Sequence, residues 1–426
     1  SVLTDMGRTQ AQLSGEALAE LPLTAAYASP LSRASETAAI LLEAHGHGMV
    51  ASLREDLLEI DLSSWSGLLR SDLAGRDPEG ERRWRHAPAS LELTRPDGSL
   101  YRPVQELMTQ ASGFLDHLLA THAAALTDPD GAVHSDAESV LVVAHNGILR
   151  CLLLQLLQLP ASGFSRLRLD NGSLTLLNVR REPEGRLQVQ VESLNGSSHL
   201  GTNLPSTSRG PRLLLVRHGE TDWNREGRFQ GQMDIPLNAM GMTQADAARR
   251  FLGDVRIDRA YSSPMSRPRC TAEVILGDHA GVPLTCCDGL REIGHGLWEG
   301  RLEREIAAEW PDLLRDWKRK PQTVQMPDGE NLQEVWDRSL ATWNTIVGGL
   351  SADETAMVVA HDAVNKTILC GLLGLSPADI WAVKQGNGGV TLIDYPHGPE
   401  GPPVIACLNL TSHLGGVVDR TASGAL

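Results

Sequence analysis

Two arginines and two histidines occupy positions in the second half of the chain where they could carry out chemistry together. Arg217 and His218 directly follow a short apolar run, and Arg267 and His361 each lie just beyond another. A guanidinium group matches the oxygens of a phosphate in shape and charge, and an imidazole is a nucleophile that can accept a phosphoryl group. If the three runs are neighbouring strands, these residues form a site for phosphoryl transfer without a metal ion.

Such a site also needs an acid that protonates the leaving oxygen. Glu292 is the candidate, because it follows a strand-like run and precedes a glycine-rich turn beside Trp298. A carboxyl group that packs near an aromatic ring and near a bound phosphate has a raised pKa, which favours the protonated form that a general acid requires.

The elements that must position these residues alternate along the chain. Apolar runs at 213–216, 257–261 and 357–359 predict buried strands, and the patterns at 243–252, 267–276 and 332–347 predict helices. Strands that alternate with helices form parallel sheets, whose ligands bind at the carboxyl ends of the strands. We therefore expect the α/β class, with three-layer α/β/α architecture and a mostly parallel sheet.

The 426-residue chain repeats itself. Five segments recur in the same order: 5–11 at 239–245, 27–33 at 261–267, 58–67 at 291–300, 142–145 at 358–361, and 194–200 at 408–414. This length also suits two domains of ordinary size. We predict a tandem duplication with domains at 1–202 and 212–426, joined by a linker at 203–211 that is rich in Gly, Ser, Pro and Thr.

The first copy retains three of the site residues. Arg33, Glu59 and His145 match Arg267, Glu292 and His361, with a longer insertion between the acid and the second histidine. The counterpart of residues 212–234 would precede Ser1, so this copy lacks its nucleophile strand and exposes apolar sheet edges. Two explanations stay open: the natural protein carries that segment upstream, which the retained residues favour, or the first copy is a degenerate structural or regulatory module.

The second copy resembles the histidine phosphatase superfamily, in its phosphoglycerate mutase-like branch. The resemblance rests on the segment from Arg217 to Thr221, followed by Asn224 and by Gln230-Gly231. The later motifs follow in order: Ser263-Pro264 with Arg267, Glu292 with 298–300, and Ala360-His361. It covers about 212–415, and a truncated version covers 1–200.

The resemblance implies a role for each matched residue. His218 is the phosphorylated nucleophile, Arg217, Arg267 and His361 hold the phosphoryl group, and Glu292 is the proton donor. The pocket that binds the phosphate and the substrate is lined by Asn224, Gln230 and Gly231. Two departures stand out: Asp362-Ala363 follows His361 where relatives often have small glycines, and Pro268 follows Arg267 where alanine is common. Asp362 places a negative charge near the site.

Four other residues have simpler interpretations. Trp298 is predicted to anchor packing, and the repeated His199 and His413 to make structural hydrogen bonds. His295 has no repeated counterpart and is predicted at the surface or at the pocket rim.

The reaction expected from this resemblance is phosphoryl transfer through a phosphohistidine, without cofactor or metal ion. The segment between Glu292 and His361 is short for a mutase, which favours a hydrolase over an isomerase. A small phosphorylated metabolite, such as a sugar or sugar-acid phosphate, is the expected substrate. Phosphoglycerate mutase activity is the alternative. A phosphometabolite-binding module without catalysis is the alternative from another class.

The amino-acid composition limits the kinds of binding partner that we expect. The net charge of −15, with no compensating basic stretch, argues against a nucleic-acid or anionic-membrane partner. The six cysteines have no CxxC spacing and fit reduced thiols in a cytoplasm. The sequence leaves open whether the protein forms a homo-oligomer.

Overall fold

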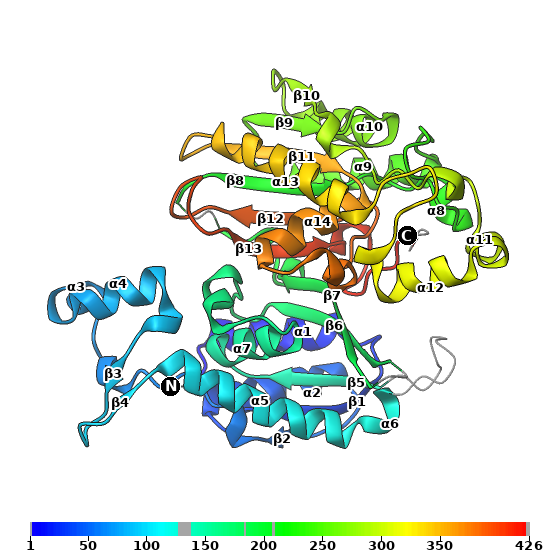
Figure 1. The fold of residues 1–426 in the computed structure, drawn as a ribbon. Helices are drawn as coiled ribbons and strands as arrows, with labels where there is room; N and C mark the ends of the chain where they lie inside the picture. Colours follow the sequence, from blue (N-terminus) through cyan, green and yellow to red (C-terminus); the bar gives the residue numbers. More distant parts are fainter. Residues whose placement is uncertain (1, 127–137, 183–184, 207–208, 423–426) are drawn as a thin grey trace. The chain divides into compact units, whose positions relative to one another are not determined.

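The computed structural model describes residues 2–126, 138–182, 185–206 and 209–422 (Figure 1). The chain forms two compact units. Unit 1 comprises residues 1–174, 178–189 and 199–202, and unit 2 comprises 175–177, 190–198 and 203–426. Parts of the β6 and β7 segments thus belong to unit 2, although they lie in the first half of the sequence.

Unit 2 is organised by a mixed sheet in the order β10-β9-β11-β8-β12-β13-β7-β6. The strands β10, β9, β11 and β8 are parallel, whereas β12 runs antiparallel to both of its neighbours. The strands are β6 (Leu174–Arg181), β7 (Leu187–Gly196), β8 (Arg212–Arg217), β9 (Arg259–Ser262), β10 (Leu284–Cys286), β11 (Thr355–Ala360), β12 (Val390–Asp394) and β13 (Val404–Leu410).

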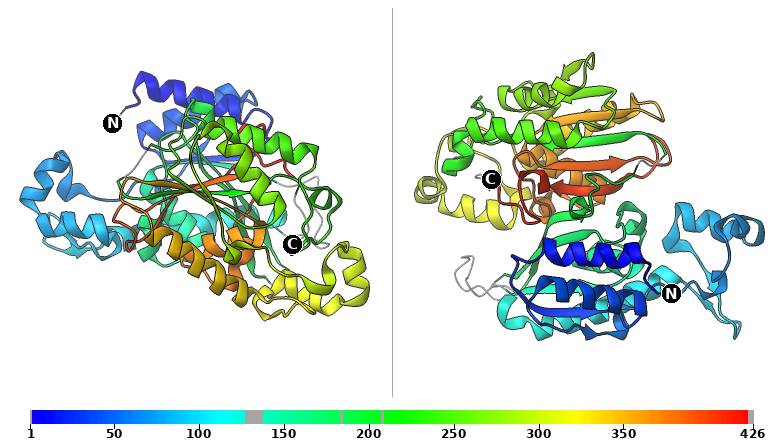
Figure 2. Two further views of the ribbon diagram at one scale, coloured as in Figure 1. Left: turned by 90° about the horizontal axis from the view of Figure 1, so that it is seen from above. Right: turned by 180° about the vertical axis from the view of Figure 1, so that it is seen from behind.

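Helices cover both faces of this sheet, with α9 and α10 on one side and α13 and α14 on the other (Figure 2). The α9 and α10 side includes Leu214, Val216, Met357 and Val359 in one buried apolar cluster. The helices of unit 2 are α8 (Asp222–Glu226), α9 (Ala239–Leu252), α10 (Ser266–Ile275), α11 (Glu303–Glu309), α12 (Pro311–Arg319), α13 (Leu332–Gly348) and α14 (Asp362–Leu373).

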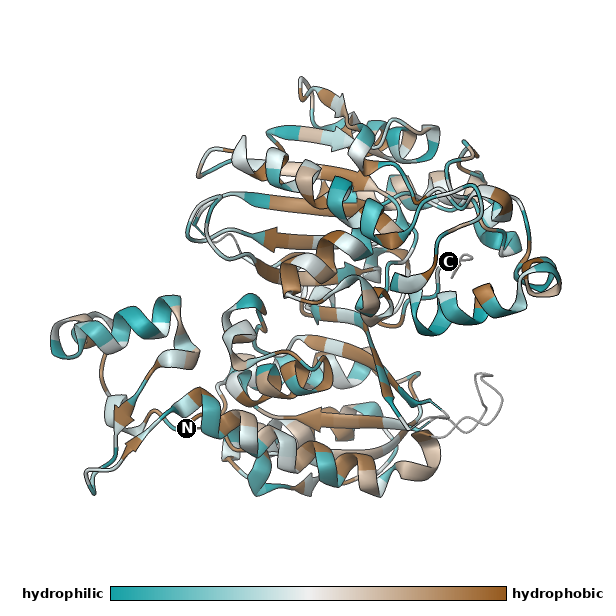
Figure 3. Cartoon of the chain, viewed as in Figure 1, coloured by the Kyte–Doolittle hydropathy of each residue, from teal (hydrophilic) through white to brown (hydrophobic). Residues whose placement is uncertain are grey.

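The central strands are apolar on both faces because helices cover both faces. Every residue of β8, β11 and β12 is buried, and these strands are largely brown in Figure 3. Their register places the carboxyl ends of β8, β9 and β11 next to one another, because Arg217 pairs with Ala360 and Val359 pairs with Ser262. The sheet therefore delivers the residues that follow β8, β9 and β11 to one edge.

Unit 1 has a three-stranded parallel sheet in the order β2-β1-β5, with a separate β3-β4 hairpin. Its strands are β1 (Leu23–Ala28), β2 (Ser52–Leu53), β3 (Leu93–Thr94), β4 (Leu100–Tyr101) and β5 (Ser139–Val143). Its helices are α1 (Asp5–Ala17), α2 (Ser32–His45), α3 (Arg70–Arg76), α4 (Pro78–His86), α5 (Pro103–Thr121), α6 (Ala123–Leu126) and α7 (Asn146–Leu156).

The expected α/β class with parallel sheets is confirmed, and two local expectations need correction. Helix α9 begins at Ala239 rather than at 243, because the side chain of Asn238 accepts a hydrogen bond from the amide of Gly241 and caps the helix. Glu292 does not directly follow a strand, because β10 ends at Cys286 and the 3₁₀ turn Asp288–Leu290 intervenes. In the part of the chain that the structure describes, every helix is too short or too polar to cross a membrane.

Candidate active site

Four of the predicted residues meet at the carboxyl edge of the unit 2 sheet. Arg217 ends β8 and His218 follows it, Arg267 is the second residue of α10, and His361 lies between β11 and α14. All four side chains are buried, with at most 3% of each residue exposed. The rings of His218 and His361 lie 5.1 Å apart between centroids. The structure thus brings together residues that the sequence separates by more than a hundred positions.

The contacts of His218 leave one ring nitrogen available for attack. Its Nδ1 lies 2.7 Å from the carbonyl oxygen of Gly219, so it carries the proton and donates that hydrogen bond. Its Nε2 then carries the lone pair, and Arg267 Nε donates to it at 3.3 Å. Burial, reinforced by Arg267 and Arg217, lowers the pKa of His218 well below the ordinary range. The imidazole is therefore neutral and nucleophilic over the physiological pH range.

The two arginines are fixed mainly by backbone carbonyls. Arg267 donates to the carbonyl oxygens of Gly231 at 2.8 Å and Met233 at 2.9 Å, and Arg217 donates to that of Gln385 at 2.5 Å. The Nε of Arg217 is buried without a hydrogen-bond partner among the described residues. A buried donor of this kind is costly unless a ligand satisfies it, so it is well suited to a phosphoryl oxygen.

His361 is held by a serine from the neighbouring strand. Its Nε2 lies 2.9 Å from Ser263 Oγ. Burial and the surrounding charges, of which Arg267 is the largest, lower the pKa of His361 well below its ordinary value. This imidazole is therefore also neutral, so it is a hydrogen-bonding group rather than a cation.

Glu292 is anchored by two backbone amides. Ile293 N donates to Oε1 at 3.0 Å, and Ala363 N donates to Oε2 at 3.3 Å. Burial raises the pKa of Glu292, and Asp362 raises it further, against smaller opposing effects of Ile293 N, Arg267 and Arg217. This is the shift that a general acid needs.

The three predicted pocket residues have different surroundings. Asn224 Oδ1 accepts hydrogen bonds from the amide and hydroxyl of Thr221, both at 3.1 Å, and so completes the capping box that Thr221 forms at the start of α8. Gln230 is buried, and its Oε1 has no partner among the described residues. Gly231 has φ 53°, and a Cβ there would lie 2.0 Å from Glu299 Oε1. The positive φ favours glycine at this position, where the carbonyl oxygen accepts a hydrogen bond from Arg267.

Sequence reasoning missed two residues that organise the site. Ser263 holds His361, and Asn387 Nδ2 donates to the carbonyl oxygen of His218 at 3.1 Å and to Asn224 Oδ1 at 3.3 Å. A signal for each was present in the repeat. Ser29 occupies the position of Ser263, and the pair Asn171-Gly172 recurs as Asn387-Gly388.

The prediction for His295 was wrong. It is 1% exposed, and its ring packs edge-on against Phe229 and Trp317. Burial lowers its pKa to about 3, so it is a neutral core residue. The packing role of Trp298 is confirmed by its full burial against Phe229, and His413 Nε2 makes the expected structural hydrogen bond, to the carbonyl oxygen of Gly388 at 3.1 Å.

Unit 1 contains the same scaffold around a second cluster. His145 Nε2 lies 2.9 Å from Ser29 Oγ. Ile60 N and Gly147 N donate to Glu59 Oε1 at 2.9 and 3.0 Å. Burial and the charge of Arg33 lower the pKa of His145 to about 4. These contacts reproduce those of His361 and Glu292.

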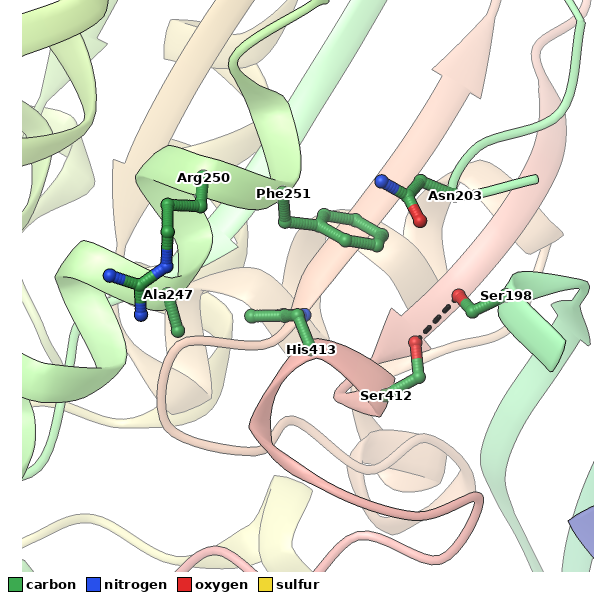
Figure 4. A pocket seen from close by; sticks show the side chains of 7 residues that line it. All are labelled: Ser198, Asn203, Ala247, Arg250, Phe251, Ser412 and His413. Atoms are coloured by element: carbon green, nitrogen blue, oxygen red, sulfur yellow. Dashed lines mark hydrogen bonds between the residues drawn. The ribbon is translucent and has the colours of Figure 1, made fainter. Parts of the chain in front are cut away.

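A surface pocket of unit 2 lies outside this cluster (Figure 4). Its walls include Phe251, stacked on His413 at 4.6 Å between ring centroids, and Ser198 and Ser412, whose hydroxyls are 2.7 Å apart. None of the predicted site residues lines this pocket, so it is distinct from the candidate active site. Within the described ranges, His, Cys, Asp and Glu side chains form no group of three or more that could hold a metal ion.

Comparison with known proteins places this arrangement in a family. The profile of the histidine phosphatase superfamily (branch 1) matches residues 1–190 and 213–406. A 2-carboxy-D-arabinitol-1-phosphatase of Triticum aestivum is 28% identical over 97% of this chain and 82% of that protein. Phosphoserine phosphatase 1 of Hydrogenobacter thermophilus is 33% identical over 48% of this chain and 94% of that protein.

A 2,3-bisphosphoglycerate-dependent phosphoglycerate mutase 2 of Gloeobacter violaceus is 33% identical over 40% of this chain and 80% of that protein. Relatives therefore include both phosphatases and mutases. Since the superfamily profile covers most of the sequence in two separate matches, the chain belongs to the histidine phosphatase superfamily and contains two copies of its domain.

Proposed function

We propose that unit 2 hydrolyses a small phosphorylated metabolite through a phosphohistidine on His218. The observation that carries this proposal is the hydrogen bonding of His218, which leaves a neutral imidazole with its Nε2 lone pair beside Arg267. Arg217, Arg267 and His361 hold the phosphoryl oxygens, and Glu292 is the general acid. Asn224, Gln230 and Gly231 shape the phosphate and substrate pocket.

In the first step, Nε2 of His218 attacks phosphorus as the ester P–O bond breaks. Glu292 gives its proton to the leaving oxygen, so an alcohol departs rather than an alkoxide. In the second step, water attacks the phosphorylated histidine, the P–N bond breaks, and the carboxylate of Glu292 accepts a proton from that water. The arginines balance the charge on the equatorial oxygens in both steps.

The substrate class we propose is a sugar or sugar-acid phosphate. Support comes from the relatives named for 2-carboxy-D-arabinitol 1-phosphate and for phosphoserine, which are small phosphorylated acids. We propose hydrolysis rather than a mutase reaction because the segment between Glu292 and His361 is short. The similarity to a phosphoglycerate mutase keeps phosphoryl return to substrate as the second candidate.

We further propose that residues 212–426 act as the catalytic domain, 203–211 as a linker, and 1–202 as a companion domain that retains counterparts of Arg267, Glu292 and His361. A reducing cytoplasm fits the six cysteines, which have no CxxC spacing.

The test uses the full chain and a His218→Ala variant with phosphoglycerates, phosphosugars and an aryl phosphate. Free phosphate and acid-labile phosphate on the protein are both recorded. Release of phosphate with labelling that is lost in the variant supports the proposal. Transfer of the label to a second oxygen of the substrate would favour the mutase, and ligand binding that is unchanged in His218→Ala without any turnover would favour the non-catalytic binding module.

A further inference from the structure

A buried ion pair lies next to the candidate active site, and the mechanism above does not use it. Asp362 is the first residue of α14, directly after His361, and its Oδ2 lies 2.9 Å from Lys366 Nζ one turn later. The two residues are 3% and 6% exposed. Burying two charges is expensive even when they are paired, so a pair here invites a functional explanation.

Only one oxygen of Asp362 is committed to Lys366. The other, Oδ1, is buried without a hydrogen-bond partner in the described part of the chain, and it lies 4.0 Å from Arg217 Nη1. The amide of the next residue, Ala363, donates to Glu292 Oε2. The free oxygen of Asp362 is therefore close both to a predicted phosphate ligand and to the peptide that anchors the predicted acid.

The first copy shows that the scaffold does not need this carboxylate. At the matching positions α7 has Asn146 and Arg150. Asn146 Nδ2 donates to the carbonyl oxygen of Leu169 at 2.5 Å, while Glu59 keeps the same amide contacts as Glu292. The second copy therefore differs from the first by one negative charge at an otherwise shared position.

Lys366 in the second copy and Arg150 in the first copy each lie over an aromatic ring. Lys366 Nζ lies 5.1 Å from the ring centroid of Trp381, and the guanidinium of Arg150 lies 5.3 Å from that of Phe164. Because the cation and its aromatic support are present in both copies, they are not what distinguishes the second copy. The distinguishing feature is the carboxylate of Asp362.

We propose that Asp362 is a positioning residue for the phosphoryl transfer proposed above: fixed by Lys366, it orients Arg217 and balances the charge around Glu292. The largest charge effects on Glu292 come from Asp362, Arg267 and Arg217. A further cation, Arg338, donates to the backbone carbonyl oxygen of Glu292 at 3.0 Å. The cations alone would favour ionised Glu292, which cannot donate a proton. The negative charge of Asp362 opposes them and keeps the acid protonated to higher pH.

The signs of these charges determine how the pKa of Glu292 changes when Asp362 is replaced. Replacing Asp362 with asparagine removes the negative charge, so the pKa of Glu292 falls. In the variant, Glu292 therefore loses its proton at a lower pH than in wild type. Activity that depends on protonated Glu292 declines at a correspondingly lower pH. An alkyl phosphate depends on this proton because an alkoxide is a poor leaving group, whereas a nitrophenyl phosphate has a stable leaving anion and depends on it much less.

The experiment compares wild type with Asp362→Asn in the full chain, using kcat/KM against pH for 3-phosphoglycerate and for a nitrophenyl phosphate. We expect the alkaline limb for 3-phosphoglycerate to move down by about one pH unit. This shift corresponds to roughly a tenfold loss of kcat/KM on that limb and little loss at acidic pH. The nitrophenyl phosphate profile should move much less. Asn146→Asp, which adds the charge in the first copy, is the matched control and should leave both profiles in place.

A uniform loss of kcat/KM at every pH, with the limb unmoved, would overturn the proposal and assign Asp362 a structural role. Asp362→Asn leaves Lys366 buried without its partner, so the double variant Asp362→Asn/Lys366→Met is measured as well. Because Lys366→Met also removes a cation, the limb of the double variant is expected to lie between those of Asp362→Asn and wild type. A larger shift in the double variant than in Asp362→Asn would also overturn the proposal. Phosphohistidine labelling of wild type is scored separately: its absence contradicts the proposed function, whereas labelling with an unmoved limb contradicts only the role of Asp362.

Discussion

The two copies of the domain share a scaffold and differ in what completes it. In each copy a histidine that follows a strand forms a hydrogen bond with a serine at 2.9 Å, and a glutamate accepts hydrogen bonds from two backbone amides. Only the second copy, among the described residues, adds an Arg-His pair from a further strand, β8. The acid and the second histidine are therefore placed by local turns and helix starts, and they do not need the nucleophile strand.

The number of neighbouring strands determines how deeply the matching strands β5 and β11 are buried. Strand β11 has hydrogen-bonded strands on both sides and is completely buried, whereas β5 has a strand on one side and is half-buried along its length. The β5 residues Val140, Leu141, Val142 and Val143 are as apolar as those of β11. Sequence alone would give the two strands the same environment, and the neighbour strand makes the difference.

The largest expected difference concerns His218, the proposed nucleophile, and His145, which is the counterpart of His361 in the first copy. His218→Ala should lower kcat by a factor on the order of 10⁴ or more, because the nucleophile is lost. His145→Ala in the first copy should leave kcat unchanged. Both are measured by phosphate release from the same substrate. A comparable loss in His145→Ala would show that the first copy takes part in turnover.

Substitution of Glu292 should affect activity far more than substitution of its counterpart Glu59. Glu292→Gln should reduce kcat/KM for an alkyl phosphate by about 10²- to 10⁴-fold, because glutamine cannot donate the proton. The loss should be smaller for a nitrophenyl phosphate, and Glu59→Gln should be silent with both substrates. Equal losses with the two substrates would argue against Glu292 as the proton donor.

Amide hydrogen exchange should distinguish β5, at the edge of its described sheet, from β11 in the interior of the larger sheet. Val358 and Val142 occupy matching positions, and the amide of Val142 faces the side of β5 that has no partner strand among the described residues. We expect Val142 to exchange at least about 100-fold faster than Val358, because its opening breaks fewer sheet contacts. Equal protection of the two amides would mean that the edge of β5 is covered in solution.

The dependence of activity on pH should reflect the opposite pKa shifts of the two proposed catalytic groups, His218 and Glu292. The pKa of His218 is lowered and that of Glu292 is raised. With an alkyl phosphate, kcat/KM should therefore rise as His218 loses its proton at low pH and fall as Glu292 loses its proton at higher pH. Glu59→Gln should leave this bell-shaped profile in place, and a profile without the alkaline fall would contradict the role of Glu292.

The smallest effect is expected from metal removal. Attack by an imidazole, with arginines around the phosphoryl group, needs no metal ion, so a chelator should leave phosphate release by the full chain unchanged. Readdition of Mg²⁺ serves as the control. Activity that disappears with chelator and returns with Mg²⁺ would contradict the proposed mechanism.

Much of the site could be predicted from the sequence, because its parts are local. Apolar runs define strands, polar residues at their ends point to ligands, and the internal repeat pairs Arg33 with Arg267 and His145 with His361. Each of these patterns lies within a short segment, so side-chain type and the spacing of apolar residues are enough to identify it. The α/β class and the cluster of arginines and histidines follow from them.

Burial and pairing were decided only by the tertiary structure. The sequence around His295 is polar enough for a surface, yet packing against Phe229 and Trp317 buries it. Nothing local shows that one oxygen of Asp362 binds Lys366 while the other approaches Arg217. The identity of a residue is fixed by the chain, but its pKa and its available hydrogen bonds depend on neighbours from distant segments, which only the folded sheet and its helices bring together.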